Sequence, residues 1–110
     1  MSLADKIRKA REVKVEVDTF TFTVRRPTDL EMIELQKQTA ARAILPFIVD
    51  WSGVSELSMF DGGAPHPLPF DQEACAEWLE DRLDILSKIV KETFAAYQAH
   101  KAKIEQLTKN

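Results

Sequence analysis

The chain has 110 residues, of which 45% are hydrophobic and 30% charged, and its net charge is −3 at pH 7. These values indicate one globular domain, 1–110, and argue against a disordered chain. The small negative charge gives no reason to expect nucleic acid or an anionic membrane as partner. Cys75 is the only cysteine, so no disulfide can form within the chain, which favours a reducing compartment.

No segment predicts export or membrane insertion. The longest apolar run, 43–49, contains Pro46 and is far too short to span a bilayer. Residues 1–6 carry charges without a long apolar core behind them, so we expect no signal peptide. These features predict a cytoplasmic protein.

The N-terminal quarter predicts a short amphipathic segment followed by a β-hairpin. We expect the basic residues before position 12 to be solvated, with Ile7 facing inward. Residues 12–25 alternate apolar and polar side chains, which is typical of two strands, and Asp18 and Thr19 are the expected turn. One face should be buried and the other solvated. The solvated face contains Lys14, Glu16, Thr21 and Thr23.

A helix is predicted over residues 28–43. Thr28 and Glu31 have the spacing of a capping box, and Pro46 should end the helix or kink the chain shortly after it. The buried face of this helix should be narrow, because its apolar residues form an imperfect stripe. These are Leu30, Ile33, Leu35 and Ala40.

The second half predicts a loop and then helices. Residues 47–54 are interpreted as a third strand or an extended arm, and 55–70 as a loop rich in glycine and proline. Asp71 should cap a helix over 71–81, and a long helix should follow over 82–108. Apolar residues follow a heptad-like spacing there, and we expect Leu79 to Val90 to be covered. The stripe consists of Leu79, Leu83, Leu86, Val90, Thr93, Tyr97, His100, Ile104 and Leu107.

Together these elements predict an α+β fold: an N-terminal β-hairpin packed on a mainly α-helical body with a long C-terminal helix. The switch from a period of two to a period of 3.6 residues falls at Pro27 and Thr28. Trp51 has two interpretations. It is a core residue beneath the loop, which we favour because buried aromatic side chains dominate core energetics. Alternatively it is an interface hot spot, because tryptophan is enriched at such positions.

The sequence contains no recognisable catalytic or metal-binding constellation. His66 and His100 lack a second ligand at the spacing of zinc sites, and Cys75 is best explained as a small buried residue. The carboxylates around position 80 have the spacing of a solvated helix face. We therefore expect no metal, no cofactor, no small-molecule substrate and no enzymatic activity.

The chain resembles the small tail assembly chaperones of long-tailed, siphophage-like bacteriophages and prophages. The resemblance covers nearly the whole chain and rests on the order and spacing of three short motifs, before a helix-rich C-terminal half. They are Thr23-Val24-Arg25-Arg26-Pro27-Thr28-Asp29, Val49-Asp50-Trp51-Ser52-Gly53-Val54 and Pro67-Leu68-Pro69-Phe70-Asp71.

The resemblance implies a non-enzymatic role in phage tail assembly. Proteins of this family coat the long, aggregation-prone tape measure protein while the tail tube polymerises, and are then shed. The expected partner is therefore the tape measure protein, in the cytoplasm of the bacterial host, and the mature virion should lack this protein. A homo-oligomer is also expected. The candidate partner-binding residues are Trp51, Phe70, Tyr97, Ile104 and Leu107.

Two other classes stay open from the sequence. One is a structural phage component, such as a tail-completion or head–tail connector subunit, which would remain in the virion. The other is a generic protein-interaction module, whose gene would lie outside a tail gene cluster. An adjacent, very long reading frame for a tape measure protein would favour the chaperone.

Overall fold

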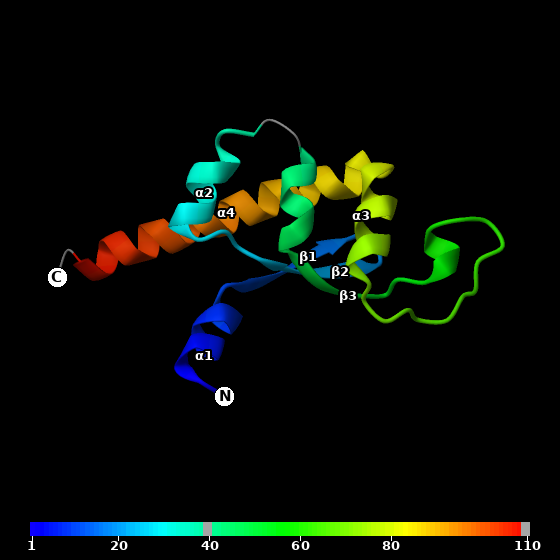
Figure 1. Cartoon of the computed structure of the whole chain (residues 1–110), viewed down its shortest axis with the longest axis horizontal. Coiled ribbons are helices and arrows are strands. Elements are labelled where there is room, and N and C mark those ends of the chain that lie inside the picture. The colour runs from blue at the N-terminus through cyan, green and yellow to red at the C-terminus, as the bar shows by residue number, and fades with distance from the viewer. Residues whose placement is uncertain (39–40, 109–110) are drawn as a thin grey trace.

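The computed structural model of the chain describes residues 1–38 and 41–108. It confirms the α+β class: a small antiparallel sheet lies against helices, and the last helix is long (Figure 1). In chain order the elements are α1 (Leu3–Ala10), β1 (Glu12–Val17), β2 (Phe20–Arg25), α2 (Asp29–Leu35), the 3₁₀ helix η1 (Ala41–Phe47), β3 (Ile48–Ser52), the 3₁₀ helix η2 (Glu56–Ser58), α3 (Gln72–Glu80) and α4 (Leu83–Thr108).

The hairpin predicted over 12–25 forms the first two strands of a three-stranded sheet with the order β1-β2-β3. Residues 48–52 form the third strand, antiparallel to β2, which decides between the two interpretations of that segment. Because β2 is the central strand, Thr23 is buried and accepts a hydrogen bond from the Lys14 ammonium group. The expectation that Thr23 lies on a solvated face is therefore wrong, because Thr23 is flanked by Lys14 of β1 and Asp50 of β3.

The hairpin turn and the residue that follows β3 both have a backbone conformation with a positive φ. Asp18 has a φ of +54°, a left-handed conformation that aspartate tolerates in turns. Gly53, directly after β3, has a φ of +79°, and a Cβ there would lie 2.5 Å from the carbonyl oxygen of Thr19. The hairpin turn and the end of β3 therefore pack too closely for any side chain at position 53.

The helix predicted over 28–43 is shorter than expected. The Thr28–Glu31 capping box is present, but α2 ends at Leu35, and residues 41–43 belong to η1, which contains Pro46. The buried face of α2 consists of Met32 and Leu35, while Leu30 and Ile33 are exposed. Ala40 lies outside the described residues. The tighter winding of η1 directs Ile44, Leu45 and Phe47 into the core.

Helix α4 runs along the long axis of the molecule and packs on β1, α3 and η1 (Figure 1). Asp71 caps α3 as predicted, by accepting a hydrogen bond from the amide of Ala74. The buried residues of α4 all lie in its first half and are Ile85, Leu86, Ile89 and Thr93. Leu83 is 64% exposed. The expectation that the stripe is covered from Leu79 to Val90 is therefore wrong at Leu83. Among the described residues, none of the helices is long and apolar enough to cross a membrane.

Helix α1 stands off from the body of the molecule (Figure 1). Ser2 and Asp5 form a capping box, and the Arg8 guanidinium pairs with the Asp5 carboxylate at 2.8 Å, so the helix is stabilised by local contacts. None of its residues is buried, and Ile7 is 48% exposed. The expectation that Ile7 faces inward is wrong, because the segment forms a separate helix before the sheet begins.

Cys75 is fully buried on α3, as its apolar neighbours predict. Burial raises the pKa of its thiol to about 12. The reactive thiolate is therefore scarce at pH 8, and we expect no reaction with a coloured disulfide reagent in the native protein. One thiol per chain should react after unfolding in guanidinium chloride. Rapid stoichiometric labelling under native conditions would contradict the buried position.

Candidate partner-binding surfaces

Trp51 lies on β3 at the point where the sheet meets the long loop, and its side chain is only 6% exposed. Its indole N–H donates a hydrogen bond of 2.9 Å to the carbonyl oxygen of Leu68. Its ring packs edge-on against Phe70 and Trp78, with centroids 5.1 Å and 6.2 Å away. Trp51 is thus a core residue that fixes the end of the loop to the sheet.

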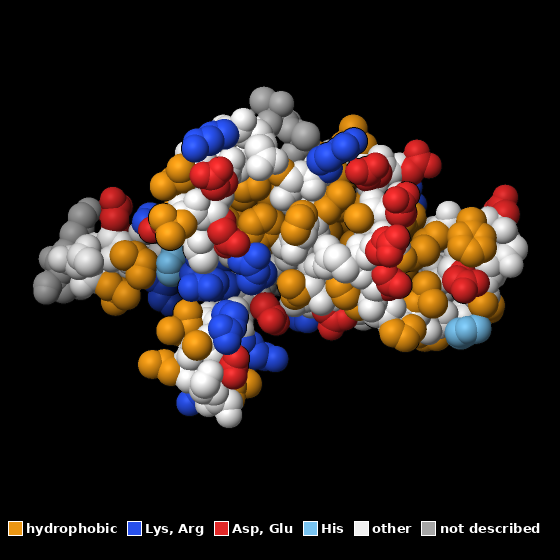
Figure 2. All heavy atoms as spheres, viewed as in Figure 1, with side chains coloured by type: hydrophobic (Ala, Val, Ile, Leu, Met, Phe, Trp, Pro, Cys, Tyr) orange, Lys and Arg blue, Asp and Glu red, His pale blue; other side chains and the backbone are white. Residues whose placement is uncertain are grey.

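An apolar hollow of about 420 Å³ lies beside Trp51, which is one of the residues that line it. Trp51 and Phe70 form part of its wall, and Phe60, which is 56% exposed, contributes a large apolar side chain to its lining. Hydrophobic side chains gather over this end of the molecule, which the loop between β3 and α3 forms (Figure 2). The remaining lining residues are Glu56, Met59, Leu68, Pro69, Asp71 and Ala74.

The loop that carries Phe60 is held by its own hydrogen bonds. The Glu56 carboxylate accepts a bond of 3.1 Å from the amide of Ala64, and the amide of Leu57 donates to the carbonyl of Ala64. At its base, the amide of Leu68 donates to the carbonyl of Val54 at 2.9 Å. The hollow is therefore lined by a closed loop anchored to β3, which favours a preformed binding surface.

Tyr97 lies far from the hollow and connects α4 to α2. Its hydroxyl donates a hydrogen bond of 2.7 Å to the Asp29 carboxylate, and the Lys101 ammonium group lies 3.1 Å from the same carboxylate. These bonds lower the pKa of Asp29, with the Tyr97 hydroxyl as the largest cause, and they raise the pKa of Tyr97. Tyr97 therefore positions α4 against α2.

The last turns of α4 extend beyond the body of the molecule (Figure 1). Ile104 and Leu107 lie there, 41% and 67% exposed, one turn apart on the same side of the helix. Apolar side chains at this spacing on a projecting helix suit a helix–helix contact.

We expect the chain to self-associate through this end of α4, with Tyr97, Ile104 and Leu107 in the contact. Sedimentation velocity at high protein concentration should then show dimers or larger species. The double variant Ile104→Ser with Leu107→Ser should be monomeric, whereas Leu83→Ser, which removes an exposed leucine elsewhere on α4, should behave as the parent protein. A strictly monomeric parent protein would contradict this expectation.

The five candidate residues thus fall at two separate places. Trp51 and Phe70 are in contact beside the hollow, while Tyr97, Ile104 and Leu107 lie along the second half of α4. The sequence reading missed Phe60, because residues 55–70 were interpreted only as a loop. The available signal is the number of large apolar residues in that segment, which are Leu57, Met59, Phe60, Leu68 and Phe70.

The acidic residues around position 80 are exposed, as the solvated-face interpretation predicts. Among the described residues, no three histidine, cysteine or carboxylate side chains gather closely enough to hold a metal ion.

No family model, no curated protein and no solved structure matches the chain.

Proposed function

We propose that this protein is a non-enzymatic tail assembly chaperone, which binds the tape measure protein in the host cytoplasm during tail assembly and is released before the virion is complete. Two things support the proposal. The first is the resemblance of the three ordered sequence motifs. The second, which carries the structural argument, is the apolar hollow formed by Trp51, Phe60 and Phe70. An exposed apolar hollow on a small domain is typical of a surface that binds another protein.

The hollow is suited to an apolar side chain from a helical client. Its volume of about 420 Å³ exceeds that of any single side chain, so one bulky residue and part of its neighbour fit. Phe60 contributes the exposed contact, while the hydrogen bond from the Trp51 indole to the carbonyl of Leu68 holds that ring in the wall. A client helix would bind by placing successive apolar residues in the hollows of successive copies.

The end of α4 complements this mode of binding. If neighbouring copies contact one another through Ile104 and Leu107, each bound copy raises the effective concentration of the next along the client. Many weak single contacts then produce a stable coat. The coat can still be removed, because each individual contact is weak.

Co-expression tests the proposal. The tape measure protein of the same tail gene cluster should be insoluble when expressed alone and soluble when this protein is co-expressed. Both should then co-purify, with many copies of this protein on each client molecule. A client that stays insoluble, with no complex recovered, would contradict the proposal.

A further inference from the structure

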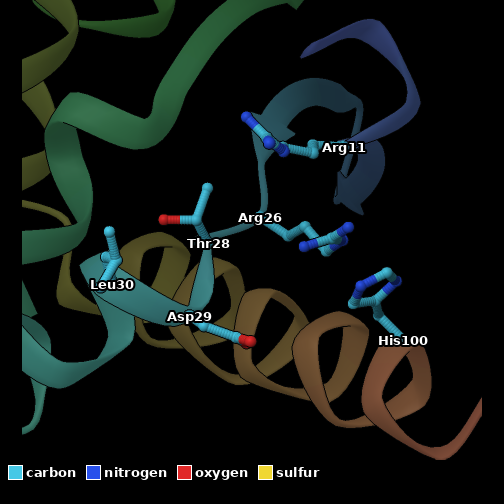
Figure 3. Close-up of a pocket in the computed structure, with 6 residues that line it drawn as sticks. All are labelled: Arg11, Arg26, Thr28, Asp29, Leu30 and His100. Atoms are coloured by element: carbon cyan, nitrogen blue, oxygen red, sulfur yellow. The ribbon is translucent and has the colours of Figure 1, made fainter. Parts of the chain in front are cut away.

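Two arginines and a histidine line a second pocket, on the opposite side of the molecule's centre from the hollow. The amide of Arg26 donates a hydrogen bond of 2.8 Å to the carbonyl of Arg11, which places the outer ends of β1 and β2 together. With His100 of α4 they line a pocket of about 390 Å³. The Arg26 side chain points toward His100, while the Arg11 side chain extends from the neighbouring strand end in another direction (Figure 3). The other lining residues are Thr28, Asp29 and Leu30.

The two arginines of this pocket form no ion pair among the described residues, and the Asp29 carboxylate, which lines the same pocket, offsets their positive charge in part. Within the described part of the chain, the Arg26 guanidinium donates only a long bond of 3.3 Å to the carbonyl of Pro27. The nearby Asp29 carboxylate is bound by Tyr97 and Lys101. Burial, followed by the charge of Arg11, lowers the pKa of Arg26, and the charge of Asp29 opposes this lowering only in part. An anion in the pocket would relieve this repulsion.

We propose that Arg11, Arg26 and His100 form a binding site for a carboxylate of an acidic protein segment. A guanidinium group matches the geometry of a carboxylate and binds it through two parallel hydrogen bonds. Leu30, which is 78% exposed, lines the same pocket and suits an apolar residue next to the acidic one.

The exposed Leu30 in the pocket favours a carboxylate of a protein segment over the phosphates of a nucleic acid. Although the net charge of the chain is −3, Lys and Arg side chains gather around α1 and the adjoining part of the body, so charge alone does not separate the two kinds of anion (Figure 2). A phosphate backbone has no apolar side chain to place against Leu30, whereas a protein segment with an apolar residue next to an acidic one does. The inference goes beyond the proposed function, because it holds whichever protein supplies the carboxylate.

His100 provides a direct reporter of this site. Its pKa is lowered by burial and then by the charge of Arg26, and the groups that face it also include Asp29, Lys101 and Lys103. A carboxylate bound between Arg26 and His100 would stabilise the protonated imidazole and raise its pKa. His66 lies on the loop between β3 and α3, outside the pocket, and serves as the internal control.

The test is an NMR titration of the two histidine rings between pH 5 and 8. The probe is a short capped peptide of alternating glutamate and leucine, and the control is the same peptide with glutamine for glutamate. At saturation the acidic peptide should raise the pKa of His100 by about one pH unit and leave the ring resonances of His66 at their positions without peptide. Arg26→Gln should weaken peptide binding at least tenfold, while Arg42→Gln, an exposed arginine outside the pocket, should not.

Arg11→Gln repeats the test if the Arg26 variant proves unstable, and should also weaken binding. The inference is overturned if the glutamine peptide has the same effect, if neither peptide moves the pKa of His100, or if both arginine variants bind normally. Tighter binding of inorganic phosphate or of an oligothymidylate than of the acidic peptide would also overturn it, because the site would then select phosphate. None of these measurements uses the tape measure protein, so their outcome is independent of the chaperone proposal.

Discussion

Replacing Trp51 with alanine should lower the free energy of unfolding by about 3–5 kcal/mol. The substitution removes the aromatic contacts to Phe70 and Trp78 and leaves a cavity between the sheet and α3. It also leaves the carbonyl of Leu68 without the indole N–H, its only side-chain donor among the described residues. Urea denaturation followed by circular dichroism at 222 nm measures the effect.

Two control variants separate the causes of this loss. Trp51→Phe keeps most of the apolar volume and removes only the hydrogen bond to Leu68, so its effect should be clearly smaller. Leu57→Ala changes an exposed loop residue and should stay within about 0.5 kcal/mol of the parent protein. If Trp51→Ala barely alters stability but abolishes client binding, the interface interpretation of Trp51 is correct instead.

Replacing Phe60 with serine should weaken client binding by about 2 kcal/mol or more, which is roughly thirtyfold. Phe60 is the most exposed large apolar residue that lines the hollow, so its removal takes away contact area with little change in the core. The free energy of unfolding should change by less than about 1 kcal/mol. Titration of the purified protein into a fluorescently labelled client fragment measures the affinity.

Leu83→Ser is the matched control for Phe60→Ser. Leu83 is 64% exposed and lies outside the hollow, so the substitution has the same chemical character at another site. It should leave client affinity unchanged. Equal loss of affinity in both variants would mean that general surface hydrophobicity, and not the hollow, determines binding.

The sequence predicted those elements that depend on local chemistry. The period of two residues in 12–25 and the caps at Thr28 and Asp71 are short-range signals, and all three are present in the structure. The helix over 28–43 was predicted too long, because residues 36–43 include good helix formers such as lysine, glutamine and alanine. Packing of Ile44, Leu45 and Phe47 into the core requires a different path there, and local propensity does not contain that information.

Less of the candidate sites than of the fold could be predicted from the sequence. Trp51 and Phe70 were identified by their motifs, and their contact depends on the loop returning to β3. The pocket of Arg11, Arg26 and His100 joins residues from both ends of the chain, so no spacing along the sequence indicates it. Burial of Thr23 likewise required knowledge that β3 pairs with β2.

The central claim is that the protein binds the tape measure protein during assembly and then leaves. Quantitative mass spectrometry of isolated tape measure complexes and of purified mature virions from the same culture tests it most directly. The account predicts many copies of this protein on each tape measure molecule in the complexes and none in the virions. A fixed copy number in the virions, with none on the tape measure protein before assembly, would identify a structural tail subunit and contradict the account.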